Sequence, residues 1–488
     1  MAEKFDVAVI GSGPGGYAAA IRCAQKGAAV AIIEKEQIGG TCLNRGCIPS
    51  KALLASAHIL IIAKNASLMG VEIENPKVNW NKMQTRKDAI VAGFRKGLAG
   101  LIQSNKIKIF QGEGFVTAKN KIAVEGSNPA EIEAKKIIIA TGSVPIEIPA
   151  FAFDGKNIIS STEALNLSHI PKSMIIIGGG VIGCEMACIY ATVGSKVTII
   201  EALPSILPFE DEWVGQLLTR ELKKIGIDVI TGKKAAACEK SDSNVKLSLE
   251  DGQTIEAEKV LVSVGRKAFC DSRTIKTLSL EMNPVRDNKS DKPDSKSTEV
   301  ASKAVVSNGM NGSAIKVNEK MQTSAADVYA IGDVVGTTYL AHGAFLEAET
   351  AAENAMGGNA CIKDYSLVPR AVYTFPEVAS VGKNETRCKQ MGIDYTIGRA
   401  FFKANGRSLA HNETTGEARV VRDKKTNEII GITMVGAAVT EMIACARALL
   451  GNKEPICEIS FAHPTVSEVL KEAWEDAFGI SLHTPPKR

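Results

Sequence analysis

The strongest constraint on the fold of this chain is a glycine-rich motif that occurs twice. Each copy places three glycines between a strand-like apolar run and a helical pattern: Gly11, Gly13 and Gly16, then Gly178, Gly180 and Gly183. An acid, Glu34 or Glu201, follows the first glycine by 23 residues in both copies, at the end of a second apolar run. In βαβ units that bind dinucleotides, such glycines allow a tight turn, a close phosphate and close helix–strand packing, and the acid meets a ribose. The sequence therefore predicts two βαβ units.

Composition agrees with an α/β protein. The chain has 488 residues, and at roughly 100–200 residues per domain it is long enough for about two to four domains. Aromatic residues make up only 5% of the chain and 43 residues are glycine, which favours a nucleotide-binding α/β fold over a β-sandwich. The net charge is +4 without any concentrated basic block, so we expect no nucleic-acid partner.

The same sequence favours a cytoplasmic location. It holds no uninterrupted apolar run of about 18 residues, so we expect no membrane span. Its first residues, MAEKFDVAVIGSG, lack the layout of a signal peptide. Eleven cysteines, an odd number spread along a long chain, disfavour a secreted disulfide framework.

The chain changes character after the second βαβ unit. Residues 283–313 contain no Leu, Ile, Phe, Tyr or Trp, and we expect a polar, flexible surface insertion there. From about residue 352 onwards, strand patterns such as Ala371–Phe375 mix with helical patterns. This part predicts an α+β domain.

Two cysteines, Cys42 and Cys47, lie in a glycine-flanked segment just after the first βαβ unit. Pro49 indicates the first turn of a helix, whose positive end favours a thiolate. Such a pair can cycle between disulfide and dithiol. A zinc site and a purely structural pair are the alternatives, but zinc needs two more ligands and only His58 is near in the sequence. We expect no metal.

A histidine near the C-terminus is the candidate base. His463 precedes a proline, and Glu468 follows five residues later. A carboxylate can orient an imidazole and raise its basicity. Alone, such a pair is usually structural, and the cysteine pair is what favours a catalytic role.

Taken in order, these motifs resemble those of the flavin-dependent pyridine nucleotide–disulfide oxidoreductases. The resemblance covers nearly the full chain and is carried by GSGPGG, GGTCLNRGCIPSK, ATGS, GGGVIGCE, VGR, AIGD, LAH and HPTVSE. It implies two Rossmann-like domains and a C-terminal interface domain that forms a homodimer. The implied parts are an FAD domain (1–149) completed by a central segment (314–351), an NAD domain (150–282) and an interface domain (352–488).

The resemblance also implies the cofactor sites. The implied FAD residues are Gly11, Gly13, Gly16, Glu34, Thr41, Lys51, Gly114, Thr141, Gly142, Asp333, Leu340, Ala341 and His342. The implied NAD residues are Gly178, Gly180, Val181, Ile182, Gly183, Glu201 and Gly265. A carboxylate at position 201 would repel a 2′-phosphate, and no Arg follows before Arg220, which favours NAD over NADP.

The family mechanism implies roles for the remaining site residues. Cys42 would exchange with substrate and Cys47 would contact the flavin, beside an ion pair of Lys51 and Glu185. His463, oriented by Glu468, would deprotonate the dithiol that enters the cavity of the other subunit. The resemblance implies an enzyme that oxidises dihydrolipoyl groups on a lipoylated acyltransferase or H-protein. Electrons would pass through the cysteine pair and FAD to NAD⁺. The alternatives are a glutathione- or mercuric-type reductase and a docking flavoprotein with little catalysis.

Two positions depart from the family pattern. Phe461 stands where relatives often have a second histidine, and Arg45 stands where relatives are often apolar. Our hypothesis is that Arg45 lowers the pKa of the Cys42 thiol; the alternative is a solvated side chain.

Overall fold

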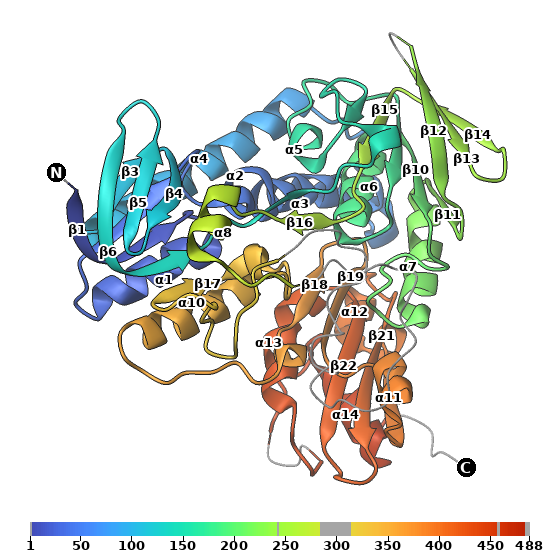
Figure 1. Cartoon of the computed structure of the whole chain (residues 1–488). Helices are drawn as coiled ribbons and strands as arrows, with labels where there is room; N and C mark the ends of the chain where they lie inside the picture. Colours follow the sequence, from blue (N-terminus) through green and yellow to red (C-terminus); the bar gives the residue numbers. More distant parts are fainter. Residues whose placement is uncertain (1, 242–243, 284–313, 456–458, 484–488) are drawn as a thin grey trace.

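The computed structural model of the chain describes residues 2–241, 244–283, 314–455 and 459–483. All of the predicted polar insertion except Asn283 lies outside these residues. Two mainly parallel sheets occupy the upper left and right of Figure 1, and a C-terminal antiparallel sheet lies below them.

The first βαβ unit lies in a sheet of order β3-β2-β1-β6-β5-β4, with β17 also pairing with β6. Strands β1, β2, β3, β6 and β17 run parallel, and β2 is buried along its whole length, as a strand covered on both faces requires. Helices α1 and α10 pack together beside this sheet. The strand and helix bounds are β1 (Glu3–Ile10), α1 (Pro14–Gln25), β2 (Val30–Glu34), β3 (Lys108–Gln111), β4 (Glu113–Ala118), β5 (Lys121–Glu125), β6 (Ala130–Ile139), β17 (Val328–Ala330) and α10 (Ala341–Ala355).

The second βαβ unit lies in a parallel sheet of order β11-β10-β9-β15-β8. A small antiparallel sheet, β12-β13-β14, and the β7–β16 pair accompany it. The bounds are β7 (Ser143–Pro145), β8 (Ile158–Ile159), α5 (Ser161–Ala164), β9 (Ser173–Ile177), α6 (Val181–Val193), β10 (Lys196–Glu201), α7 (Glu212–Lys224), β11 (Ile227–Thr231), β12 (Ala235–Lys240), β13 (Val245–Leu249), β14 (Thr254–Ala257), β15 (Lys259–Val262), β16 (Arg266–Ala268) and α8 (Ser272–Leu278).

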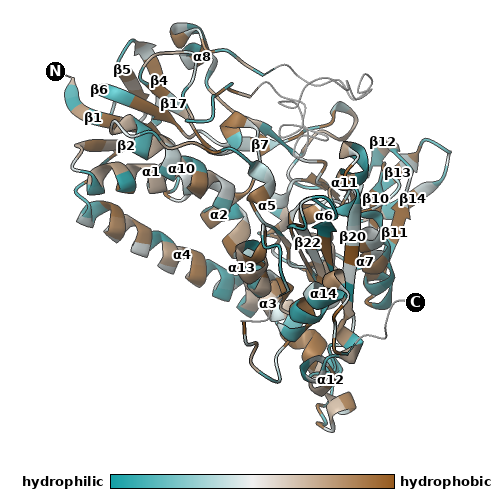
Figure 2. Cartoon of the chain, turned by 90° about the horizontal axis from the view of Figure 1, so that it is seen from below, coloured by the Kyte–Doolittle hydropathy of each residue, from teal (hydrophilic) through white to brown (hydrophobic). Residues whose placement is uncertain are grey.

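Three α-helices lie between β2 and β3: α2 (Gly40–Arg45), α3 (Cys47–Lys64) and α4 (Trp80–Ser104). The cysteine motif lies on α2 and α3. Helix α3 packs against α4 and α6. Among the described residues, the stretch 40–64 is long and apolar enough to cross a membrane by those two criteria alone. Here Gly46 divides it into two helices, and its buried face includes Leu53 and Leu54, which belong to the core shared with the second sheet. Figure 2 shows hydrophobic and hydrophilic residues alternating along the neighbouring α4.

The C-terminal sheet is antiparallel, of order β18-β19-β22-β21-β20. Helices α13 and α14 pack on it around the fully buried Trp474. The bounds are β18 (Arg370–Val372), β19 (Glu377–Gly382), α11 (Glu385–Met391), β20 (Tyr395–Phe401), α12 (Gly406–Ala410), β21 (Glu417–Asp423), β22 (Ile429–Gly436), α13 (Val439–Leu449) and α14 (Glu468–Phe478).

These sheets confirm the predicted α/β class with a C-terminal α+β unit. The predicted strand Ala371–Phe375 is too long, because β18 ends at Val372 and residues 373–376 connect it to β19. Pro376 follows Phe375 directly, and a proline cannot donate a hydrogen bond to a sheet ladder, which disfavours a longer strand here. The domain boundaries stay predictions.

Candidate active site

A cavity of about 1380 Å³ brings the two glycine motifs and the two cysteines together. The residues predicted from the sequence as site residues line it, with the exception of Gly183, His463 and Glu468. Segments from both mainly parallel sheets and from the C-terminal sheet contribute to its wall. Sequence positions more than 300 residues apart therefore meet in one place.

The first glycine motif forms a cradle whose outer glycines are required by packing. Gly11 has φ +102°, and a Cβ there would lie 2.3 Å from the carbonyl oxygen of Ala140. A Cβ at Gly16 would lie 1.9 Å from the carbonyl oxygen of Gly11. A Cβ at Gly13, by contrast, would meet no atom within 4 Å. The open side of Gly13 lies at the N-cap of α1, where free backbone N–H groups can bind a phosphate.

The second motif repeats this geometry. Gly178 has φ +106°, and a Cβ there would lie 2.6 Å from the carbonyl oxygen of Ser263. A Cβ at Gly183 would lie 2.0 Å from the carbonyl oxygen of Gly178, whereas one at Gly180 would meet nothing within 4 Å. Gly183 is therefore a packing residue, as Gly16 is in the first motif. Both cradles fit a dinucleotide pyrophosphate.

The acid of each unit is held beside its cradle by backbone N–H groups. The Ser12 N–H donates to Oε2 of Glu34 at 2.9 Å, and the Gly179 N–H donates to Oε2 of Glu201 at 2.7 Å. Both acids are buried but line the cavity, so each carboxylate can also accept hydrogen bonds from a ribose diol there.

Helix geometry brings the cysteines together. Helix α2 ends just before Gly46, and Cys47 begins α3. A Cβ added at Gly46 would lie 2.9 Å from the carbonyl oxygen of Thr41, so this close turn needs glycine. Both cysteines carry free thiols in this structure. A hydrogen bond from Cys42 lowers the pKa of Cys47 to about 7, although burial opposes this, and Lys51 adds to the lowering. The same hydrogen bond and burial raise the pKa of Cys42. Both directions favour Cys47 as the site of the negative charge in the reduced pair.

An ion pair joins the cysteine helix to the second βαβ unit. The Lys51 ammonium donates to Oε1 and Oε2 of Glu185 at 3.0 and 2.8 Å. The Glu185 side chain is only 5% exposed. Although burial opposes it, the Glu185 carboxylate raises the pKa of Lys51. Lys51 lies one helical turn after Cys47 and thus holds a stable positive charge beside it.

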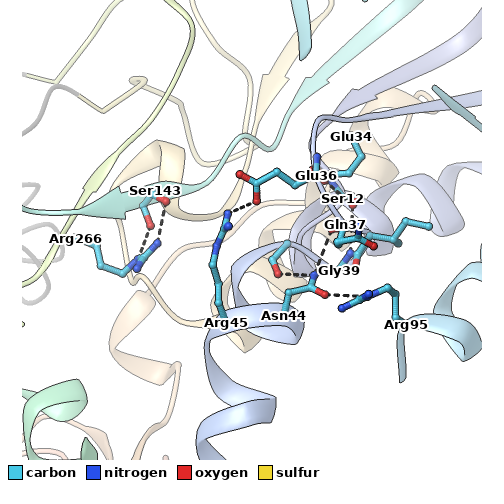
Figure 3. A network of polar contacts seen from close by, with 12 residues as sticks. Ser12, Glu34, Glu36, Gln37, Gly39, Asn44, Arg45, Arg95, Ser143 and Arg266 are labelled. Atoms are coloured by element: carbon cyan, nitrogen blue, oxygen red, sulfur yellow. Dashed lines mark hydrogen bonds and ion pairs between the residues drawn. The ribbon is translucent and has the colours of Figure 1, made fainter. Parts of the chain in front are cut away.

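Figure 3 shows a polar network around α2. Asn44 donates to the carbonyl oxygens of Ile38 and Gly40, both at 3.0 Å, and so ties α2 to the loop after β2. Arg45 forms an ion pair with Glu36 at 2.5 Å, and both side chains are about half-exposed. Arg45 therefore pairs with a carboxylate. The hydrogen bond with Cys47 and burial raise the pKa of Cys42, and the lowering by Arg45 expected from the sequence stays a hypothesis.

A second polar group lies across the cavity. Ser143 donates to Asp333, and Arg266 donates to Ser143 Oγ and to its carbonyl oxygen, both at 2.8 Å. Burial raises the pKa of Asp333, while Ser143 and Arg266 oppose the rise. Leu340 caps α10 at the cavity wall, and the first residues of that helix also line the cavity.

The candidate base lies away from this cavity. The ring Nδ1 of His463 is 2.9 Å from Oε1 of Glu468, and the Thr465 N–H donates to Oε2 of the same carboxylate at 2.8 Å. The His463 side chain is 79% exposed. Phe461, two residues earlier, packs against the core of the C-terminal sheet. The loop thus presents its imidazole outwards.

Several residues that line the cavity were not predicted from the sequence. Tyr373 contacts both Lys51 and Glu185, and only the β18–β19 turn brings it there. Lys233 and Lys234 also line the cavity, but they are paired with Asp251 at 2.7 Å and Glu250 at 4.0 Å. Their position after β11 gave no sequence signal. Within the described part of the chain, no group of three or more His, Cys, Asp or Glu side chains could hold a metal ion.

Comparison with known families identifies the chain's relatives. The model of the pyridine nucleotide-disulphide oxidoreductases matches residues 5–293, and the model of their dimerisation domain matches residues 368–474. The chain belongs to the pyridine nucleotide-disulphide oxidoreductase family. This confirms the resemblance inferred from the motifs. A dimerisation domain indicates that family members such as this one form homodimers.

Relatives in this family match over the full chain. The dihydrolipoyl dehydrogenases of Bacillus subtilis and Chlamydia muridarum are 37% and 38% identical, over 98% and 100% of this chain and 99% and 100% of their own. LpdA from Mycobacterium tuberculosis has the same fold, with a TM-score of 0.84 at 21% identity, over 96% of this chain and 98% of its own. The HOCl-induced flavoprotein disulfide reductase RclA from Escherichia coli has a TM-score of 0.81 at 24% identity, over 97% and 99%.

Proposed function

We propose that this chain is a dihydrolipoyl dehydrogenase, which oxidises protein-bound dihydrolipoyl groups with NAD⁺. The observation that carries the proposal is the placement of Cys42 and Cys47 in one cavity with two dinucleotide cradles. A dithiol substrate, a cysteine pair and two dinucleotides are the components that such an electron transfer needs. The full-length relatives of that name support the same substrate class.

The cysteine pair carries out the thiol chemistry. One substrate thiolate attacks the Cys42 sulfur of the oxidised pair, forming a mixed disulfide and releasing Cys47 as a thiolate. The second substrate thiol then closes the lipoyl disulfide and leaves Cys42 as a thiol, so two electrons enter the pair. A low thiol pKa speeds departure of a leaving group, which fits the lowered pKa of Cys47.

His463 supplies the proton acceptor for the incoming dithiol. Its ring lies outside the cavity of its own chain, so we assign it to the cavity of the partner in the homodimer. Glu468 bonds Nδ1 and thereby leaves Nε2 as the atom that takes the proton.

FAD fits the first cradle and NAD the second. Gly13 and Glu34 hold the pyrophosphate and adenosine ribose in the first, and Gly180 and Glu201 do so in the second. A bound FAD would supply two-electron redox chemistry between the cysteine pair and NAD⁺. Lys51 keeps a positive charge beside Cys47 during this exchange. The nearby Lys233 is paired with an acid, which favours NAD over NADP.

The protein partner is a lipoylated acyltransferase or H-protein, and we place the enzyme in the cytoplasm. Steady-state rates with dihydrolipoamide and NAD⁺ should exceed those with glutathione disulfide and NADPH. Preference for the second pair would overturn the assignment in favour of a glutathione-type reductase. Turnover of neither pair by flavin-loaded enzyme would support a docking flavoprotein.

A further inference from the structure

The ammonium of Lys51 is held from three parts of the fold. It lies on α3, its carboxylate partner Glu185 lies on α6, and the ring of Tyr373 comes from the turn after β18. The Lys51 Nζ is 4.4 Å from the centroid of the Tyr373 ring. The backbone N–H of Tyr373 donates to Oε1 of Glu185 at 3.1 Å. One residue of the turn between β18 and β19 thus contacts both members of the ion pair.

We propose that Tyr373 is a positioning residue for the cysteine pair: its ring face and its N–H fix Lys51 and Glu185 next to Cys47. The inference rests on the proposed function, because it concerns the redox pair of that reaction. It adds a requirement that the C-terminal sheet be docked before the pair has its working charge distribution.

The ion pair alone does not fix the position of the Lys51 ammonium. Lysine is a compact charge on a flexible four-carbon stem, and its Nζ can keep a carboxylate contact over a range of positions. A ring face adds an attraction from a second direction, and this attraction is strong where water is excluded. About a third of the Lys51 side chain is exposed, so the remaining freedom is movement toward the open cavity.

The position of Lys51 matters because its effect on Cys47 opposes that of Glu185. The ammonium lowers the pKa of Cys47, and the carboxylate raises it. If the ammonium moved away from Cys47 while Glu185 stayed, the lowering by Lys51 would weaken and the raising effect of Glu185 would remain. The Glu185 carboxylate has little freedom to follow, since it is buried and bonded to the Tyr373 N–H.

The other charged and titratable groups around Cys47 and Tyr373 come from several elements of the fold. Those that act on Cys47 are Cys42 on α2, Lys51 on α3, Glu185 on α6 and Arg266 on β16. Those around Tyr373 are Lys51, Glu185, Glu377 on β19 and Glu441 on α13, and His58 on α3 acts on Glu377. A substitution at position 373 leaves all of these other groups in the chain.

The competing explanation is that Tyr373 only fills the cavity wall. Two variants separate these explanations, because Tyr373→Phe keeps the ring face and Tyr373→Leu removes it while keeping an apolar side chain. Phe375→Leu is the matched control. It alters the same turn, where Phe375 stacks on His58 at 5.2 Å between ring centroids, whereas the ring over Lys51 is that of Tyr373.

The experiment measures the ionisation of Cys47 directly. Flavin-loaded full-length protein is reduced with one equivalent of dithionite, which supplies two electrons, and the long-wavelength thiolate–flavin absorbance is titrated across neutral pH. A second measurement needs no flavin signal: the pH dependence of Cys47 alkylation by iodoacetamide in dithiothreitol-reduced protein, read by mass spectrometry, follows the thiolate fraction. Tyr373→Met serves as a second ringless variant should Tyr373→Leu not fold.

We expect wild type, Tyr373→Phe and Phe375→Leu to share one midpoint, and the ringless variants to titrate at a pH higher by about half a unit or more. A wild-type midpoint in a ringless variant, or an equal shift in Tyr373→Phe, overturns the inference. Failure of both ringless variants to fold while Tyr373→Phe folds also overturns it, since the ring is then structural. Absence of the thiolate band from flavin-loaded wild type overturns the proposed function itself.

Discussion

A hybrid dimer of two differently disabled chains tests whether His463 acts across the subunit interface. One chain carries Cys42→Ser and the other His463→Gln, and each homodimer should lose about a hundredfold or more of its activity. In the hybrid, one cavity has both lesions and the other combines an intact cysteine pair with His463 of the partner subunit. With one of two equivalent sites complete, the hybrid should recover about half of wild-type activity.

The structural basis for this magnitude is the position of His463, which is 79% exposed and outside the cavity of its own chain. Hybrids carrying two different affinity tags are purified over both tags and assayed for NAD⁺ reduction by dihydrolipoamide. A Cys42→Ser and Cys47→Ser hybrid is the control, because both of its cavities lack a cysteine. If the first hybrid stays as inactive as its parents, His463 does not serve the partner and this reasoning is refuted.

Three further predictions concern the cradle, Arg45 and a buried acid. Gly16→Ala should lower the free energy of unfolding by about 1–3 kcal/mol through its backbone clash. Gly13→Ala should keep that stability in urea denaturation and weaken FAD binding, measured by flavin fluorescence. Arg45→Ala should leave the pKa of the Cys42 thiol unchanged in alkylation kinetics, since its guanidinium pairs elsewhere. Burial raises the pKa of Glu347 to about 7, above the reference value of 4.5. Its stabilising contribution is therefore present below pH 4.5 and lost as pH rises to about 7, and Glu347→Gln should remove up to ~3 kcal/mol of that pH dependence.

Each of these predictions has a result that contradicts it. Equal stability of Gly16→Ala and Gly13→Ala would contradict the packing role assigned to Gly16. A rise in the pKa of Cys42 in Arg45→Ala would instead support the hypothesis that Arg45 lowers this pKa. An unfolding free energy with the same pH slope in Glu347→Gln and wild type would mean that this carboxyl titrates normally.

The sequence was sufficient to predict those site residues whose role depends on their spacing within one short segment. Gly11 and Gly178 could be predicted because a βαβ turn fixes the order of strand, glycines, helix and acid within one short segment. The strand-like run predicted before the second glycine motif forms β9 (Ser173–Ile177) for the same reason. Cys42 and Cys47 stood out because both lie on one short glycine-flanked stretch.

Contacts between distant segments could not be predicted in this way. Tyr373 reaches Lys51 only because the β18–β19 turn docks against α3, and no local pattern in the sequence encodes that docking. Arg45 shows a different limit. Its charge was evident, but Cys42 and Glu36 were both near in sequence, and only the geometry of α2 selects the carboxylate.

The most direct test of the central claim compares two electron-transfer reactions in Cys42→Ser and Cys47→Ser variants. The first is dihydrolipoamide oxidation by NAD⁺, which needs the cysteine pair. The second is reduction of an artificial one-electron acceptor by NADH, which needs only the dinucleotide sites. We predict that both variants lose the first reaction and keep the second. Dihydrolipoamide oxidation at the wild-type rate in Cys47→Ser would contradict the account.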